Sequence, residues 1–354
     1  MAKYNINDKT ILTNSDIVTS SSTSRGRTLI AESLIYEDSF TATNTFLTLE
    51  SDHFTNYFTF FSPVQGTTSG YTSGGNTPAR TTTIDKFPFS SDANATDVGD
   101  LTDSRSKAAG QSSLTDGYTS GGDAPGDVTT IDKFPFAADA NATDVGDLTQ
   151  ARERIAGQSS SENGYSSGGL AVSTVVNTID KFPFSSDTNA TDVGDLSQAR
   201  AYFHGGQSSR TNGYTSGGYT TTEVNTVDKF PFSSDANATD VGDLTVLSRS
   251  STGQSSDTHG YTSGGQTGPS EPSYQNTIDK FPFAVDANAS DVGDLTQART
   301  NPSGTSSTAN GYNSGGWVPP RQTTIDKFPF SSDANATDVG DLTQARNQAV
   351  GQQV

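Results

Sequence analysis

The stretch TIDKFPFSSDANATDVGDLTQAR, residues 324–346, decides the fold because the chain repeats it six times with few changes. Its first motif, IDKFPF or once VDKFPF, recurs at spacings of 47, 48, 48, 51 and 47 residues. The motif begins at Ile84, Ile131, Ile179, Val227, Ile278 and Ile325. A regular period of this length is typical of solenoids, propellers and repeat arrays. The sequence therefore predicts six equal structural units.

Each unit carries further motifs around this stretch. G-Y-[TSN]-S-G-G precedes it, and GQSS, or a degenerate version of it, separates most units. We interpret one unit as four short strands: strand a on GQSS, b on GYTSGG, c on TIDKFPF and d on DVGDLTQAR. No segment shows helical periodicity over three turns, and four antiparallel strands per unit are typical of a propeller blade. The predicted fold is an all-β, six-bladed propeller over residues 66–354.

The number of strands also predicts how the ring closes. Strands b, c and d occur six times, but strand a occurs clearly only five times between them. A sixth copy of strand a lies at residues 349–354. We therefore expect this C-terminal strand to complete the first blade, which removes both open edges of the array.

The motifs resemble the kelch repeat. The shared features are a Gly-Gly doublet after a strand, a strand with Asp and aromatic residues, and D-L-T-x-A-R before the next unit. The resemblance covers about residues 66–354 and implies a β-propeller. The chain departs from the pattern because its only Trp, Trp317, is not at the usual late position in the unit. We expect Phe87, Phe89 and their equivalents to fill that apolar role.

Charge and composition restrict the partners. The net charge of -19 argues against binding to a phosphate backbone, which draws its affinity from clustered Lys and Arg. The chain has no cysteine, no signal-type start and no apolar run of roughly 18 residues. We expect no nucleic-acid partner, no membrane insertion, and assembly in a reducing cytoplasm.

The variable segments are the candidate binding surface. In an a-b-c-d meander the b-to-c loops and the d-to-a links share one face. Both sets differ between units, whereas the c-to-d turn SSDANATDVGD is nearly constant. Exposed aromatic and Arg side chains there could stack on sugars or anchor a protein, with neutral drift of tolerant loops as the alternative. The candidates are Arg80, Arg154, Tyr202, Phe203, Tyr219, Tyr274, Trp317 and Arg321.

No metal, cofactor or catalytic site is predicted. The turn containing Asp92, Asn94, Asp97 and Asp100 superficially suggests a calcium loop, but it lacks the Gly and the terminal Glu of an EF-hand. Asn and Asp also cap turns, and that use is sufficient here. The histidines lie in unrelated contexts, and no Ser-His-Asp set is present. Enzyme activity is therefore not expected.

Residues 1–65 share none of the repeats and contain six of the seven Phe outside KFPF. So small a segment with that much aromatic surface seldom stands by itself. We interpret it as an attachment or oligomerisation segment.

The repeated array beside GYTSGG also resembles virion structural or tail-fibre-like proteins of marine phages, notably cyanophages. This resemblance implies a non-enzymatic virion protein that is assembled in the host cytoplasm. Residues 1–65 would bind other virion proteins, and the propeller would contact a host-surface glycan or protein, as a monomer or a homo-oligomer. The alternatives are a capsid decoration protein and an intracellular kelch-type adaptor.

Overall fold

The computed structural model describes residues 10–12, 34–37, 65–202, 206–268 and 273–354. Contacts divide the chain into two units, Met1–Ser62 and Pro63–Val354. Within the first unit, the described strands β1 (Thr10–Leu12) and β2 (Leu34–Glu37) form an antiparallel pair. The rest of the predicted attachment segment, except Gln65, lies outside the described residues. Among the described residues there is no helix that could cross a membrane.

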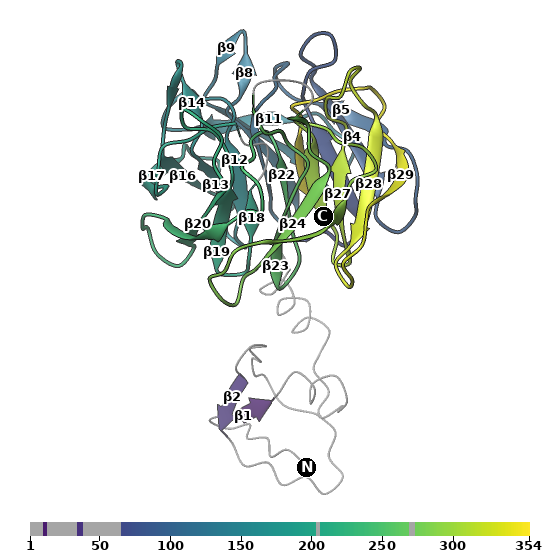
Figure 1. The fold of residues 1–354 in the computed structure, drawn as a ribbon. Helices are drawn as coiled ribbons and strands as arrows, with labels where there is room; N and C mark the ends of the chain where they lie inside the picture. Colours follow the sequence, from purple (N-terminus) through teal and green to yellow (C-terminus); the bar gives the residue numbers. More distant parts are fainter. Residues whose placement is uncertain (1–9, 13–33, 38–64, 203–205, 269–272) are drawn as a thin grey trace, which may run out of the picture. The chain divides into compact units, whose positions relative to one another are not determined.

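Six four-stranded antiparallel sheets form the propeller, as predicted (Figure 1). The a strands are β6 (Ala109–Ser112), β12 (Ala156–Ser159), β18 (Gln207–Ser208), β22 (Thr252–Ser255), β26 (Ser303–Ser306) and β30 (Val350–Gln353). The b strands are β3 (Ser69–Ser73), β7 (Asp116–Ser120), β13 (Asn163–Ser167), β19 (Asn212–Ser216), β23 (His259–Ser263) and β27 (Asn310–Ser314).

The c and d strands are given from blade 1 to blade 6, as the b strands are, whereas the list of a strands begins with blade 2 and ends with blade 1. The c strands are β4 (Thr83–Pro88), β10 (Thr130–Pro135), β16 (Thr178–Pro183), β20 (Thr226–Pro231), β24 (Thr277–Pro282) and β28 (Thr324–Pro329). The d strands are β5 (Thr96–Asp100), β11 (Thr143–Asp147), β17 (Thr191–Asp195), β21 (Thr239–Asp243), β25 (Ser290–Asp294) and β29 (Thr337–Asp341). Two small hairpins, β8 (Asp123–Ala124) with β9 (Gly126–Asp127) and β14 (Leu170–Ala171) with β15 (Thr174–Val175), lie in the b-to-c loops of blades 2 and 3.

The C-terminal strand closes the ring, which confirms the prediction. Blade 1 has the strand order β30-β3-β4-β5, so its inner strand comes from the other end of the propeller sequence. The β30–β3 register runs from Gly70 opposite Gln353 to Ser73 opposite Val350. The amide nitrogens of Thr67 and of Ser69 also donate to the Val354 carbonyl. Blade 1 therefore holds the two ends of the repeat array together.

The a strands meet around the axis through glycine. A Cβ atom on Gly157 or Gly351 would collide with the backbone carbonyl of the preceding blade's glycine. Next to the glycines, the Ser112 amide donates to Ser159 Oγ at 3.0 Å, and the same bond recurs around most of the ring. The polar cavity left at the axis has a volume of about 40 Å³.

The apolar cores lie between blades, in the six interfaces that we call seams. In seam 1–2, Tyr71, Ile84 and Leu101 of blade 1 pack against Phe134 and Phe136 of blade 2. The ring centroids of Tyr71 and Phe136 are 4.9 Å apart. The equivalents recur at every seam, including the one between blades 6 and 1, where Phe87 and Phe89 pack on blade 6. The two Phe of KFPF thus join each blade to the one before it.

The constant c-to-d turn is a second part of each seam. The Asp100 amide at the outer edge of blade 1 donates to Asn141 Oδ1 of blade 2 at 3.1 Å, and the Ala142 amide returns a 2.8 Å bond to the Asp100 carbonyl. Lys86 of blade 1 also pairs with Asp139 of blade 2 at 3.2 Å. The turn of one blade thereby covers the exposed edge of the previous one. This role explains why the turn hardly varies.

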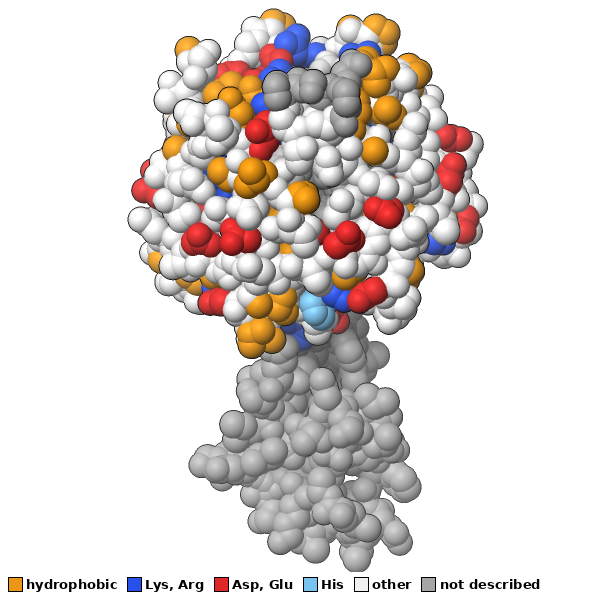
Figure 2. Space-filling view, in the orientation of Figure 1, with side chains coloured by type: hydrophobic (Ala, Val, Ile, Leu, Met, Phe, Trp, Pro, Cys, Tyr) orange, Lys and Arg blue, Asp and Glu red, His pale blue; other side chains and the backbone are white. Residues whose placement is uncertain are grey.

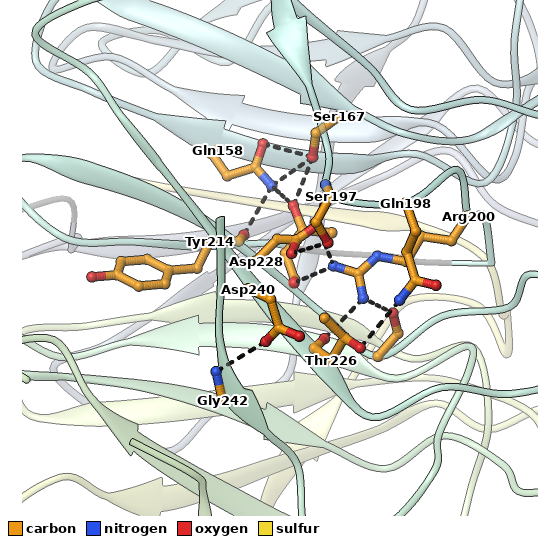
Figure 3. A network of polar contacts seen from close by, with 12 residues as sticks. Gln158, Ser167, Ser197, Gln198, Arg200, Tyr214, Thr226, Asp228, Asp240 and Gly242 are labelled. Atoms are coloured by element: carbon orange, nitrogen blue, oxygen red, sulfur yellow. Dashed lines mark hydrogen bonds and ion pairs between the residues drawn. The ribbon is translucent and has the colours of Figure 1, made fainter. Parts of the chain in front are cut away.

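A buried ion pair completes five of the six seams (Figure 3). In seam 3–4, Arg200 of the DLSQAR motif reaches Asp228 of blade 4 at 2.9 Å, and both side chains are fully buried. The same carboxylate accepts bonds from the backbone amide and hydroxyl of Ser197. The other four pairs are Arg105–Asp132, Arg152–Asp180, Arg299–Asp326 and Arg346–Asp85.

Candidate functional site

The varied segments share one face of the propeller, which we call the loop face. Short backbone bridges join each d-to-a link to the b-to-c loop of the next blade, as in Glu153 with Leu170 and Thr300 with Trp317. In Figure 1 the hairpins of this face stand at the top of the propeller, and in Figure 2 Lys and Arg side chains gather there, while acidic side chains are spread over the flank.

Six link residues surround the axis at this face. All have positive φ, between 57° and 69°, a conformation that non-glycine residues seldom adopt. They are Lys107, Arg154, Tyr202, Ser250, Asn301 and Gln348. Backbone bonds of 2.7–2.9 Å join five successive pairs, for example from the Arg154 amide to the Lys107 carbonyl. These bonds place the positive-φ residues of successive links next to one another.

Two predicted tyrosines form the centre of an aromatic and cationic cluster. The rings of Tyr202 and Tyr219 lie 5.3 Å apart in an edge-to-face arrangement. The Arg154 guanidinium lies over Tyr202 at 4.0 Å, and that of Arg249 lies within 5.3 Å of both ring centroids. Glu223 holds Arg249 through a 3.3 Å ion pair. These five residues are called the tyrosine cluster below.

A chain of charges extends the tyrosine cluster across blades 1 to 3. Asp123 binds both Arg80, at 2.6 Å, and Lys107, at 3.0 Å. Lys107 also binds Glu153 at 2.8 Å, and Glu153 in turn binds Arg154. Burial raises the pKa of Asp123, but hydrogen bonds from Arg80 and Lys107 outweigh that effect and hold its pKa below the ordinary value. The charged groups are therefore fixed in place by one another.

The remaining candidates lie elsewhere on the loop face. The Arg321 guanidinium lies 5.0 Å from the Trp317 ring and donates to Asn347 Oδ1 at 3.0 Å. Tyr274 makes a backbone bridge with Gln266 in the loop of blade 5. Phe203 lies outside the described residues. The candidates thus divide into the tyrosine cluster with its charges, the Trp317–Arg321 pair, and Tyr274.

Sequence reasoning missed Lys107, Asp123, Glu153, Glu223 and Arg249. All five lie in the same varied loops and links, so their location was visible in the sequence. Their contacts were not visible, because each joins segments of different blades.

The calcium candidates have structural partners. Asp92 pairs with Lys327 at 2.5 Å, and Asn94 Oδ1 accepts from the Asp341 amide at 3.0 Å, both across the closing seam. Asp97 accepts from the Gly99 amide, and Asp100 accepts from the Thr82 hydroxyl. No group of three His, Cys, Asp or Glu residues suited to a metal ion occurs in the part of the chain that the structure describes.

The distribution of cations singles out the loop face. Most described Lys and Arg side chains are committed to the seams, as the KFPF lysines and the buried arginines. The others at the loop face are Arg80, Lys107, Arg154, Arg249 and Arg321, while Arg210 lies in an a-to-b turn on the opposite face. In a chain with net charge -19, this face is where cations and half-buried aromatic rings meet.

Comparison with known proteins adds no family. No protein-family model matches the chain, and no curated protein matches it.

Proposed function

We propose that the chain is a non-enzymatic structural protein at the surface of a phage particle, as a tail-fibre or similar component. Its propeller contacts a host-surface glycan or protein, or another virion protein, through the loop face. Residues 1–65 attach it to the particle. The kelch-like pattern of the repeats and their likeness to marine phage virion proteins support this proposal.

The observation that carries the proposal is the separation of constant and varied sequence. The constant motifs lie in the seams, where Asn141 and Asp139 bind blade 1, and their function is structural. The varied segments lie on one face and present the tyrosine cluster. Rigid aromatic and Arg side chains are the usual anchors of binding surfaces.

The entry point of the propeller chain also supports the proposal. Gln65 Nε2 donates to the Ser255 carbonyl at 2.9 Å, and the Gly66 amide donates to the Ser306 carbonyl. The Thr308 amide, in an a-to-b turn, donates to the Gly66 carbonyl. The propeller chain therefore begins at the face opposite the loop face.

The particle itself provides the first test. We expect mass spectrometry of purified phage particles to detect this chain, and immunogold labelling to place it at the tail or fibre. Label over the capsid would instead identify a decoration protein. Absence from purified particles, with the chain present in the infected cell, would contradict the proposal and favour an intracellular adaptor.

The tyrosine cluster provides the second test. Because truncation of a hot-spot Tyr or Arg in an interface typically costs about 2 kcal/mol or more, we expect Tyr219→Ala or Arg249→Ala to slow phage adsorption to host cells roughly tenfold or more. Arg210→Ala, on the opposite face, is the matched control and should adsorb like the wild type. Equal adsorption of all variants, with unchanged thermal unfolding, would remove the tyrosine cluster as the contact surface.

A further inference from the structure

Seam 4–5 lacks the buried arginine of the other five seams. Where blades 1, 2, 3, 5 and 6 end strand d with Arg, blade 4 has the sequence DLTVLS, so Ser248 occupies that position. Asp279 of blade 5 remains in place and is only 3% exposed. Thr245 donates its backbone amide and its hydroxyl to this carboxylate at 2.8 and 2.6 Å. The seam therefore keeps the buried carboxylate but has no cationic side chain from this position.

The sister seams show what surrounds the missing guanidinium. Arg200 donates to the carbonyls of Thr215, Gly217 and Thr226 at 2.9–3.1 Å, besides its pair with Asp228. Arg346 and Arg299 bind the equivalent carbonyls of their own seams. All these oxygens therefore face one cationic group.

The same oxygens recur at seam 4–5. The residues equivalent to the sister carbonyls are Thr262, Gly264 and Thr277, on strands whose register matches that of the other blades. Ser248 adds a hydroxyl that is buried and has no hydrogen-bond partner. Three carbonyls, one hydroxyl and one carboxylate are thus expected to face the position that a guanidinium occupies elsewhere.

Neither neighbour of Ser248 in the chain replaces the guanidinium. Arg249, the next residue, points to the loop face, where it binds Glu223 and lies over the Tyr219 ring. Leu247 is 51% exposed and so does not fill the seam.

We propose that seam 4–5 binds a monovalent cation of about the size of K⁺ between Ser248 and Asp279, in place of the arginine of the other seams. A single carboxylate balances one positive charge, so a divalent ion would be left with an uncompensated buried charge. In the sister seam, Nη1 and Nη2 of Arg200 lie 3.1 and 3.0 Å from two separate carbonyl oxygens, a wider arrangement than the roughly 2.3–2.6 Å contacts that Ca²⁺ requires. Oxygen ligands suit a hard cation.

The test is cation-dependent thermal unfolding of the full chain at constant ionic strength. We expect the midpoint of the wild type to rise saturably by about 2–4 °C when KCl replaces choline chloride, whose cation is too large for the seam. Ser248→Arg supplies the guanidinium, so its midpoint should exceed that of the wild type in choline and should not respond to K⁺. Asp279→Asn should also lose the response, because it removes the balancing charge.

A matched variant tests the inference by gain of the site. Arg299→Ser recreates the arrangement of seam 4–5 at seam 5–6, so its midpoint should fall in choline and recover partly in K⁺, with a larger response than the wild type. Should this variant fail to fold, Ser248→Arg and Asp279→Asn still decide the question. Identical wild-type midpoints in K⁺ and choline would overturn the inference. A full K⁺ response in Ser248→Arg or Asp279→Asn would overturn it as well, because it would place the cation elsewhere.

Discussion

Deletion of residues 350–354 is expected to leave the propeller largely unfolded near physiological temperature. The deletion removes β30, four paired positions with β3, and the buried Val350. It also removes Gln352, which donates to Ser73, Thr119 and the Tyr118 carbonyl. A buried Val is worth about 1.5–3 kcal/mol and each backbone bond about 0.5–1.5 kcal/mol, so the loss approaches the whole stability of roughly 5–15 kcal/mol.

A permuted chain is the control for this deletion. In the other blades, strand a is followed by one Ser and then by two turn residues before strand b begins. In blade 2 these two turn residues are Leu114 and Thr115. Joining Val354 directly to Thr67 gives the same spacing, with Thr67 and Thr68 in the turn. This chain should regain cooperative thermal unfolding by circular dichroism. If the truncated chain unfolds at the wild-type midpoint, the pairing of β30 with β3 in blade 1 does not hold the ring closed.

Substitution of a seam carboxylate is expected to have opposite effects at two equivalent positions. Asp326→Asn leaves Arg299 buried without a counter-charge, which costs about 3–5 kcal/mol. Asp279→Asn removes a carboxylate that has no arginine, so in choline buffer it should cost nothing or should stabilise the fold. Urea unfolding of both variants measures the difference. Equal destabilisation would show that the arginines contribute nothing specific to the seams.

The stability difference between Asp279→Asn and the wild type is expected to depend on pH. Burial raises the pKa of Asp279, and hydrogen bonds from Thr245 oppose this only in part. The folded state of the wild type holds the Asp279 proton more tightly than the unfolded state does. This proton therefore stabilises the fold fully below the unfolded pKa of about 4, and the stabilisation is lost as the pH rises through the raised pKa of the folded state. In choline, Asp279→Asn should therefore exceed the wild type most at neutral pH, and the gap should close in acid. A gap independent of pH would contradict this account.

The sequence was sufficient to predict the architecture because the motifs that specify it recur with a regular period. The six copies define the blades, and the displaced sixth strand a at residues 349–354 predicts the closure that β30 makes. The alternation of loops predicts that Tyr202 and Tyr219 share a face, and their rings are in contact.

The contacts between blades could not be predicted in the same way. A single unit does not show that Phe134 packs on the preceding blade or that Asn141 covers its edge. The SSDANATDVGD turn therefore suggested a metal loop or a local cap, although its side chains bind the preceding blade and form part of the seam. The loss of Arg at Ser248 was also visible, but its meaning depends on Asp279, which lies 31 residues further along the chain and in the next blade.

The seams have a consequence for how the gene of such a chain can evolve. Each unit supplies Tyr, and all but blade 4 supply Arg, toward the following unit, and each supplies Phe, Asp and Asn toward the preceding one, as a head-to-tail monomer does in a polymer. A gene duplication that copies one whole unit therefore creates a new seam in which the contacting side chains of both units are already present. Amplification of the gene and closure of the ring then have the same chemical requirement.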